Sequence, residues 1–163
     1  MKKSLLLKKM INERRAVVAP GCYDVLSAKL IEEAGFELTQ ASGFGISACL
    51  LGKPDVGLLG WNEMLDMTWR IAQAVDIPVM GDGDTGFGNA LNVIRTVQDF
   101  IQVGAAGFNI EDQVFPKRCG HMEGKQLVSE EEMVLKIEAA VEARKKLDPD
   151  FVINARTDAI AIT

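Results

Sequence analysis

The chain has 163 residues, of which 48% are hydrophobic, and its formal net charge at pH 7 is −5. These values predict one globular domain over residues 1–163 with a sizeable buried core. The acidic balance, without a basic stripe of interleaved aromatic residues, argues against nucleic acid as a partner, and no apolar run suggests a membrane span. Three cysteines at no metal-like spacing indicate a reducing compartment, so we expect a cytoplasmic protein whose partners are small molecules and like subunits.

The first fifteen residues, MKKSLLLKKMINERR, predict an amphipathic helix. Lys8 and Lys9 interrupt its apolar centre too early for a signal peptide. Short apolar runs then alternate with stretches of helical period. Strands are predicted at 16–20, 36–41, 77–81, 106–110 and 151–155, helices at 24–35, 62–75, 89–104 and 129–146, and a long loop between 41 and 62. The pattern is therefore a βα unit repeated four times, followed by a fifth strand.

The predicted helix ends carry suitable residues. Gly35 and Gly104 follow helices, where a left-handed residue commonly ends the last turn. Asn89 is placed to cap a helix N-terminus, and Ser129 with Glu132 forms a capping-box pattern.

Strands that alternate with helices predict a parallel sheet, either an open doubly wound sheet or a closed (β/α)8 barrel. A barrel typically needs about 250 residues, so length alone favours the open sheet. The chain stops at INARTDAIAIT, just after an apolar strand and without a closing helix. We therefore expect this ending to be an interruption of the domain.

Polar residues follow four of the predicted strands, at the point where each strand ends. They are Ser42 and Gly43, Asp82 and Asp84, Glu111 and Asp112, and Arg156, Thr157 and Asp158. Because the carboxyl ends of parallel strands form the active face of α/β folds, these groups are expected to converge on one rim.

The segment GDGDTG formally matches a dinucleotide-binding fingerprint at Gly81, Gly83 and Gly86. Such a loop must let a pyrophosphate approach backbone N–H groups, and Asp82 and Asp84 would repel it. We therefore disfavour dinucleotide binding.

Two carboxylates two residues apart at a strand end suit Mg²⁺, with Mn²⁺ as the alternative ion. Asp82 and Asp84 are the predicted ligands, and Glu111 could hold a metal-bound water. The structural alternative is that both aspartates only cap the following helix and make turn hydrogen bonds. The presence of Glu111 and Arg156 nearby favours the metal.

Arg156 emerges from an apolar run, where an arginine needs an anion as partner. A substrate carboxylate and an ion pair with Glu111 would satisfy it equally well. The run SGFG from Ser42 offers backbone N–H groups and a hydroxyl for a carboxylate, although a tight turn alone would explain its glycines.

Cys119 lies in the polar run KRCGH, in a segment predicted to be a loop. Nearby Lys117, Arg118 and His121 favour a reactive thiol that delivers a proton or attacks a carbon. His121 is equally suited to a structural hydrogen bond.

These residues together resemble the isocitrate lyase and phosphoenolpyruvate mutase superfamily. The resemblance spans APGCYDVLSA, SGFG, GKPDVG, GDGDTGFGN, NIEDQVFPKRCGH and INARTDA, which is essentially the whole chain. The KRCGH segment is similar to the cysteine-bearing lyase branch, which includes 2-methylisocitrate lyase and dimethylmalate lyase, whereas the mutase branch has asparagine in place of the cysteine. The resemblance implies a modified (β/α)8 barrel, here interrupted after about five strands, and a homotetramer in the complete form.

The resemblance also implies roles for the metal-side residues. Asp82 and Asp84 would hold Mg²⁺, with Asp84 the most direct ligand. Glu111 and Asp55 would act through metal-bound waters and hydrogen bonds.

On the substrate side, the resemblance implies that Ser42, Gly43 and Phe44 cradle a pyruvate-like carboxylate whose oxygens Arg156 steadies. Cys119 would protonate the carbanionic fragment from a mobile lid. The remaining lid residues, which would help to bind a distal carboxylate, are Lys117, Gly120 and His121.

The implied activity is Mg²⁺-dependent cleavage of a 2-hydroxy di- or tricarboxylate, such as 2-methylisocitrate, to pyruvate and a dicarboxylate such as succinate. The alternatives are oxaloacetate decarboxylation, a phosphonomutase activity, or a truncated chain without catalysis. Family members commonly carry tyrosine two residues before the serine of the SG motif, and Gln40 stands there in this chain.

Overall fold

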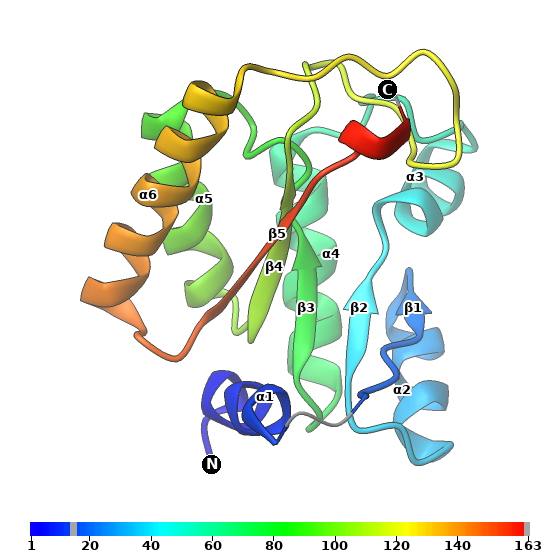
Figure 1. Ribbon diagram of the computed structural model, residues 1–163. Helices are drawn as coiled ribbons and strands as arrows, with labels where there is room; N and C mark the ends of the chain where they lie inside the picture. Colours follow the sequence, from blue (N-terminus) through cyan, green and yellow to red (C-terminus); the bar gives the residue numbers. More distant parts are fainter. Residues whose placement is uncertain (14–15, 162–163) are drawn as a thin grey trace.

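The computed structural model describes residues 1–13 and 16–161 and contains one five-stranded parallel sheet with helices around it (Figure 1). The strands are β1 (Gly21–Cys22), β2 (Thr39–Ala41), β3 (Val79–Asp82), β4 (Gly107–Glu111) and β5 (Val152–Arg156). The helices are α1 (Lys3–Asn12), α2 (Val25–Glu33), α3 (Gly43–Leu51), α4 (Trp61–Ala74), α5 (Ala90–Gln102), α6 (Glu130–Leu147) and the 3₁₀ turn η1 (Ala159–Ala161).

The strands lie in the sheet in the order of the sequence, β1-β2-β3-β4-β5, and every neighbouring pair is parallel. A doubly wound sheet reverses its strand order at a switch point, whereas a (β/α)8 barrel adds each strand beside the previous one. The observed order is therefore that of consecutive units of a barrel.

The main core lies between the sheet and helices α2 to α6. Its centre is a row of three rings, in which Phe108 lies 5.7 Å from Phe100 and 5.6 Å from Phe151 between ring centroids. A Cβ atom on Gly81 would collide with the Phe100 ring, and one on Gly83 with the Phe108 ring. Ring packing therefore explains two of the glycines in the GDGDTG segment.

Helix α1 lies at the amino ends of the strands, at the bottom of Figure 1. Its Leu7 packs in a separate cluster with Leu38, Met80 and Ala106. Lys3 donates hydrogen bonds to the carbonyl of Val75, and also of Ala72, near the C-terminus of α4. Apolar packing and backbone hydrogen bonds thus close this end of the sheet.

The predicted helix ends are confirmed in the structure, although α6 has only the Ser129 cap of the expected capping box. Asn89 accepts a hydrogen bond from the N–H of Leu91, and Ser129 Oγ accepts one from the N–H of Glu132. Gly35 and Gly104 have φ angles of 85° and 88°, the left-handed region that glycine adopts without strain.

Two element predictions were wrong. The first strand was expected at 16–20 but lies at Gly21–Cys22, directly after Pro20, which has no N–H to donate to a sheet ladder. The long loop predicted between 41 and 62 contains α3, whose opening sequence GFG has low helix propensity. Ser42 caps that helix, with Oγ 3.4 Å from the N–H nitrogen of Gly45, and supplies the start signal.

Within the described residues, no helix is both long and apolar enough to cross a lipid bilayer.

Candidate active site

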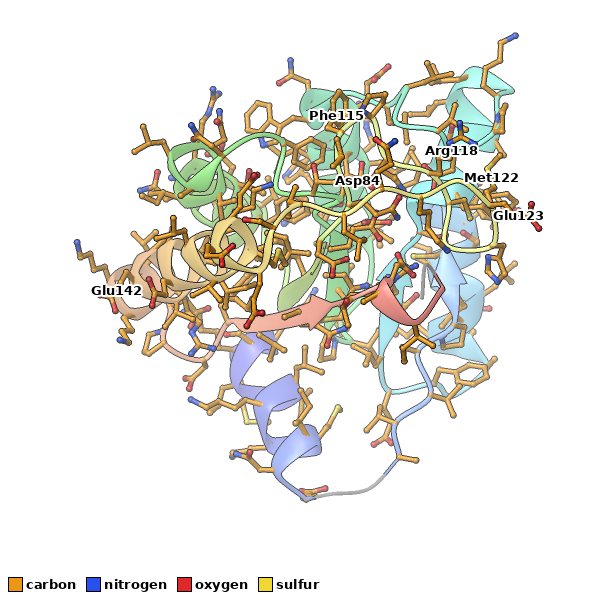
Figure 2. All side chains as sticks on the ribbon, turned by 45° about the horizontal axis from the view of Figure 1, so that its top comes forward. Asp84, Phe115, Arg118, Met122, Glu123 and Glu142 are labelled. Atoms are coloured by element: carbon orange, nitrogen blue, oxygen red, sulfur yellow. The ribbon has the colours of Figure 1, made fainter. Side chains whose placement is uncertain are left out.

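A cavity of about 790 Å³ opens at the carboxyl ends of the strands, beneath the loop that follows β4. We call residues 114–126 the lid loop; in Figure 2 its Phe115, Arg118 and Met122 lie over the end of the sheet that carries Asp84. The lining residues are Gln40, Ser42, Phe44, Pro54, Asp55, Asp82, Asp84, Asn109, Glu111, Lys117, Cys119, Gly120, His121, Met122 and Arg156.

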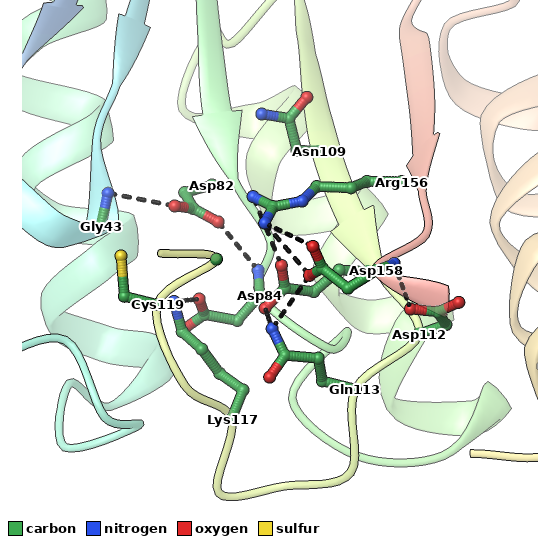
Figure 3. Close-up of polar contacts among 12 residues, drawn as sticks. Gly43, Asp82, Asp84, Asn109, Asp112, Gln113, Lys117, Cys119, Arg156 and Asp158 are labelled. Carbon is green, nitrogen blue, oxygen red and sulfur yellow. Dashed lines mark hydrogen bonds and ion pairs between the residues drawn. The ribbon is translucent and has the colours of Figure 1, made fainter. Parts of the chain in front are cut away.

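Asp82 and Asp84 occupy the end of β3 and the turn after it. Asp82 Oδ1 accepts a hydrogen bond from the N–H of Asp84 at 3.1 Å, and its Oδ2 accepts one from the N–H of Gly43 at 3.0 Å (Figure 3). Asp84 has φ 44°, a left-handed conformation that aspartate tolerates better than most residues. The turn therefore holds both carboxylates at the same rim.

Asp84 is 3% exposed and lies against the ammonium group of Lys117, which is 4% exposed. Lys117 Nζ is 2.9 Å from Asp84 Oδ1 and donates a hydrogen bond of 2.7 Å to Asp55 Oδ2. Burial, followed by the charge of Asp82, raises the pKa of Asp84 to about 7, although Lys117 opposes the shift. A further positive charge near Asp84 would therefore stabilise its ionised form.

The pKa of Lys117 is also raised, because its carboxylate neighbours stabilise the charged ammonium. Burial lowers this pKa, but the charges of Asp84 and Asp82 and the hydrogen bond to Asp55 outweigh burial and raise it above its ordinary value. Lys117 is therefore a fixed cation that links the lid loop to the carboxylates.

Glu111 and Arg156 face each other at the ends of β4 and β5, where they are register partners. Arg156 Nη1 lies 3.6 Å from Glu111 Oε2, and its Nη2 is 3.1 Å from both carboxylate oxygens of Asp158. Burial raises the pKa of Glu111, while Lys117 and Arg156 act against that shift. Arg156 thus has Glu111 as an ion-pair partner within the protein. Its side chain is also 43% exposed beside the cavity, so it can bind a substrate carboxylate as well.

The residues present fit a divalent cation of the Mg²⁺ type. In residues 1–13 and 16–161, no three or more His, Cys, Asp or Glu side chains are grouped closely enough to coordinate a metal ion by themselves. Mg²⁺ usually takes only one or two protein carboxylates and completes its shell with water and substrate. Asp84 Oδ1 is buried against the Lys117 ammonium at 2.9 Å, and four carboxylates line the cavity, with Lys117 and Arg156 as the permanent cations among its lining residues. This charge excess favours a bound cation.

The N-terminus of α3 forms another wall of the cavity. Its cap Ser42 and its second residue Phe44 line the space, and Gly43 lies directly behind them against Asp82. A Cβ atom on Gly43 would lie 2.6 Å from Asp82 Oδ2, so only glycine permits this approach. The SGFG run is thus a helix start whose first N–H donates to Asp82, and the tight-turn alternative was wrong.

The lid loop brings Cys119 and His121 to the cavity. Cys119 Sγ lies 3.6 Å from His121 Nδ1, and the Cys119 N–H donates to the carbonyl of Asp55 at 2.9 Å. A Cβ atom on Gly120 would collide with the guanidinium of Arg156. The loop therefore packs directly on the end of β5.

The structure brings together the residues that the sequence predicted. Every residue assigned a catalytic, metal-binding or substrate-binding role lines the cavity except Gly43, which contacts it through Asp82. Asp112, Thr157 and Asp158, which were expected at the same rim, do not line it. Lys117 is committed to carboxylates of the protein, whereas a distal substrate carboxylate was expected. Arg118 turns outward and donates to the carbonyl of Glu123.

Sequence reasoning missed four contributors to the site. Asn109, Pro54 and Met122 line the cavity, and Gln113 lies behind it. Only Asn109 left a usable signal, because it is a polar residue inside the apolar strand AGFNI.

The phosphoenolpyruvate phosphomutase family model matches residues 7–162. The chain is 50% identical over 153 residues to 2,3-dimethylmalate lyase of Eubacterium barkeri, covering 94% of this chain and 52% of the relative. It is 49% identical over 155 residues to 2-methylisocitrate lyase of Aeropyrum pernix (95% and 49%), and 50% identical over 151 residues to the chloroplastic carboxyvinyl-carboxyphosphonate phosphorylmutase of Arabidopsis thaliana (92% and 44%). The chain thus spans about half the length of these curated relatives.

Solved structures share the fold. Oxaloacetate acetylhydrolase with the inhibitor 3,3-difluorooxalacetate superimposes with a TM-score of 0.94 at 39% identity, covering 98% of this chain and 55% of the other. Phosphonopyruvate hydrolase with oxalate and Mg²⁺ gives 0.89 at 40% identity, covering 99% and 54%.

Proposed function

The chain belongs to the phosphoenolpyruvate mutase and isocitrate lyase superfamily, and from this premise we propose that it takes part in Mg²⁺-dependent carbon–carbon cleavage. The proposed substrate is a 2-hydroxy di- or tricarboxylate such as 2-methylisocitrate or 2,3-dimethylmalate, and one product is pyruvate. With 2-methylisocitrate the second product is succinate. The observation that carries the proposal is the meeting of Cys119 with the carboxylates of β3 and β4 in one cavity.

Asp82 and Asp84 would hold the cation, and Glu111 and Asp55 would bind waters of its shell. When bound, Mg²⁺ would supply Lewis-acid stabilisation to the hydroxyl and carboxylate oxygens of the substrate. Lys117 keeps Asp55 and Asp84 in place through contacts of 2.7 and 2.9 Å.

The α3 terminus and Arg156 would bind the substrate. The positive end of the α3 dipole favours anions, so a carboxylate would lie at the Ser42 hydroxyl and Phe44. Arg156, held by Asp158, would donate to the oxygens that become the keto acid.

Cleavage transfers the hydroxyl proton to a base of the cavity, converts the C–O bond to C=O, and leaves the electron pair of the broken C–C bond on the neighbouring carbon. That carbon then needs a proton. The Cys119 thiol would supply it, and His121 at 3.6 Å would return the proton to the sulfur.

The decisive experiment measures pyruvate release from 2-methylisocitrate, 2,3-dimethylmalate and oxaloacetate, and glyoxylate release from isocitrate, with and without Mg²⁺. Release from a hydroxy acid should require Mg²⁺ and fall at least about a hundredfold in Cys119→Ser. The control is Cys49→Ser, which changes an exposed cysteine on α3 and should leave the rate unchanged. A folded chain that releases no pyruvate would contradict the proposal.

A second candidate is decarboxylation of oxaloacetate. It is supported by the close superposition with an enzyme whose structure holds an oxaloacetate analogue. Because protonation of the resulting enolate does not demand a thiol, release from oxaloacetate that survives Cys119→Ser would favour this candidate.

A further inference from the structure

The two ends of the lid loop are joined by a short antiparallel stem. The N–H of Val114 donates to the carbonyl of Gln126 at 2.8 Å, and the N–H of Val128 donates to the carbonyl of Asp112 at 2.9 Å. Gln113 pairs with Leu127 between these two bonds. Gln113 therefore lies at the base of the loop, where a lid would hinge.

The side chain of Gln113 turns inward and clamps the loop that it begins. Its Oε1 accepts a hydrogen bond from the N–H of Arg118 at 3.0 Å, and its Nε2 donates one to the carbonyl of Arg118 at 2.8 Å. The amide thus makes the two-bond pattern by which one strand pairs with another. Arg118 lies between Lys117 and Cys119, so this clamp fixes the backbone of both.

The same amide nitrogen faces two carboxylates behind the cavity. Its Nε2 lies 3.1 Å from Glu111 Oε1 and 3.2 Å from Asp158 Oδ2 (Figure 3). An amide nitrogen has two hydrogens, so three acceptors share them. Reversing the amide would direct its oxygen at both carboxylates, so the partners determine its orientation.

These two carboxylates are also the partners of Arg156. Gln113 is 1% exposed and is the neutral donor between them. It therefore joins the lid loop, through Arg118, to the groups that orient Arg156.

We propose that Gln113 is a positioning residue that holds the lid loop in its closed position and couples this position to Glu111 and Arg156. It does not line the cavity and contacts the site through Glu111, Asp158 and the backbone of Arg118. Its action is on Cys119 and Arg156, the two groups expected to meet the substrate, and its catalytic consequence rests on the proposed function.

The first test is cleavage by an arginine-specific protease after Arg118. Gln113→Met keeps the length of the side chain but removes both hydrogen-bonding groups, and we expect cleavage after Arg118 to accelerate about tenfold or more. Cleavage after Arg70, in the middle of α4, should stay at the parental rate because it requires unfolding of a helix.

The matched control is Gln126→Met, which makes the same change at an exposed position of the same loop. It should leave the rate at Arg118 unchanged. Parental protection of Arg118 in Gln113→Met, equal acceleration at Arg70, or equal acceleration in Gln126→Met would each overturn the inference. Should Gln113→Met not fold, Gln113→Glu keeps the shape and the acceptor oxygen but loses both N–H donors, and it should expose Arg118 in the same way.

The second test separates positioning from general stability. In pyruvate release, Gln113→Met should lower kcat about tenfold with a KM within about threefold of the parent, because the proton donor is misplaced while the groups on the strands still bind substrate. A raised KM with unchanged kcat would contradict this. If no variant and no parent chain releases pyruvate, the proposed function fails, and protease protection alone decides whether Gln113 anchors the loop.

Discussion

The two ends of the same sheet have opposite chemistry. At the amino ends, Leu7 of α1 packs with the β3 residue Met80 in an apolar cluster. Two residues further along β3, Asp82 begins a group of buried and half-buried carboxylates. Because parallel strands all point one way, a four-residue strand separates a stabilising end from a reactive end.

The difference between the two ends shows which part of the fold is energetically unfavourable. The amino end buries apolar area, which favours folding. The carboxyl end buries Asp84 beside Asp82, and their repulsion and desolvation raise the pKa of Asp84 to about 7. Two adjacent carboxylates are unfavourable here unless a cation in addition to Lys117 binds them, which is why we interpret this end as a binding site.

The largest expected effect is at the reactive end. Asp84→Asn keeps the shape of the side chain but removes the charge that would bind Mg²⁺, so kcat/KM for pyruvate release should fall about a thousandfold or more. Thermal unfolding should stay cooperative, because a neutral side chain replaces a carboxylate whose charge is disfavoured by burial. The measurement is the steady-state rate at saturating Mg²⁺.

Asp66→Asn provides the control, since Asp66 is an exposed carboxylate on α4 that pairs with Arg70. It should retain parental activity. An Asp84→Asn chain with more than a tenth of parental activity would contradict the claim that the carboxyl end is the reactive end through Asp84.

A substitution at the amino end should lower stability and leave activity almost unchanged. Leu7 is 2% exposed, so Leu7→Ala should lower the free energy of unfolding by about 3 kcal/mol, through lost apolar burial and a residual cavity. The kcat for pyruvate release at a temperature where the chain is folded should change less than about twofold. Urea unfolding and the rate assay together measure both quantities.

Ile11→Ala is the matched control on the same helix, because Ile11 is 50% exposed. It should cost less than about 0.5 kcal/mol. A large loss of kcat in folded Leu7→Ala would show that the two ends are coupled.

The fold was predictable to the extent that local patterns define it. Helices such as 129–146 have a cap and a charge gradient, with acidic residues in the first turn and basic residues in the last, and they lie where expected. α3 was missed because its first residues, Gly43 to Gly45, are poor helix formers, and only tertiary contacts with Asp82 and Tyr23 require glycine there. The order of the strands could not follow from local patterns, since it depends on which strands pair.

The site was predictable where chemistry and position coincide in the sequence. Asp82, Glu111 and Arg156 end their strands and Asp84 follows two residues after Asp82, and a parallel sheet must bring such ends together. Gln113 was not predictable, because its role depends on a loop that folds back on itself and gives no periodic signal.

A smaller effect tests the contact between the α3 terminus and β3. Gly43→Ala would place a Cβ atom 2.6 Å from Asp82 Oδ2, so either the carboxylate or the helix start must move. We expect kcat/KM to fall about ten- to a hundredfold, as a displacement of a catalytic group near 1 Å would cause. Gly21→Ala is the control on the other side of Ser42, where the new atom would meet the Ser42 Cβ at 3.4 Å without collision. Equal rates in both variants would contradict the assigned role of this contact.

The smallest effect concerns pH and the proposed cation. The pKa of Asp84 is raised from its ordinary 3.8 to about 7, so the carboxyl is mainly protonated at pH 6 and ionised at pH 8. The metal binds the ionised form, and the affinity for Mg²⁺ should therefore fall as the pH drops below 7, by up to about tenfold per pH unit.

The sign for stability without metal is the reverse. A carboxyl whose pKa is raised on folding stabilises the folded state fully below its unfolded pKa of 3.8, and this contribution is lost as the pH rises through 7. Added Mg²⁺ should therefore raise Tm more at pH 8 than at pH 6, where it must displace a proton. Asp84→Asn should abolish this gain at both pH values, whereas Asp66→Asn should keep it. If Mg²⁺ raised the Tm of the parent chain equally at pH 6 and pH 8, the cation would bind to groups other than Asp84. Lys117 and Arg156 alone would then balance the charge of the carboxylates at the reactive end.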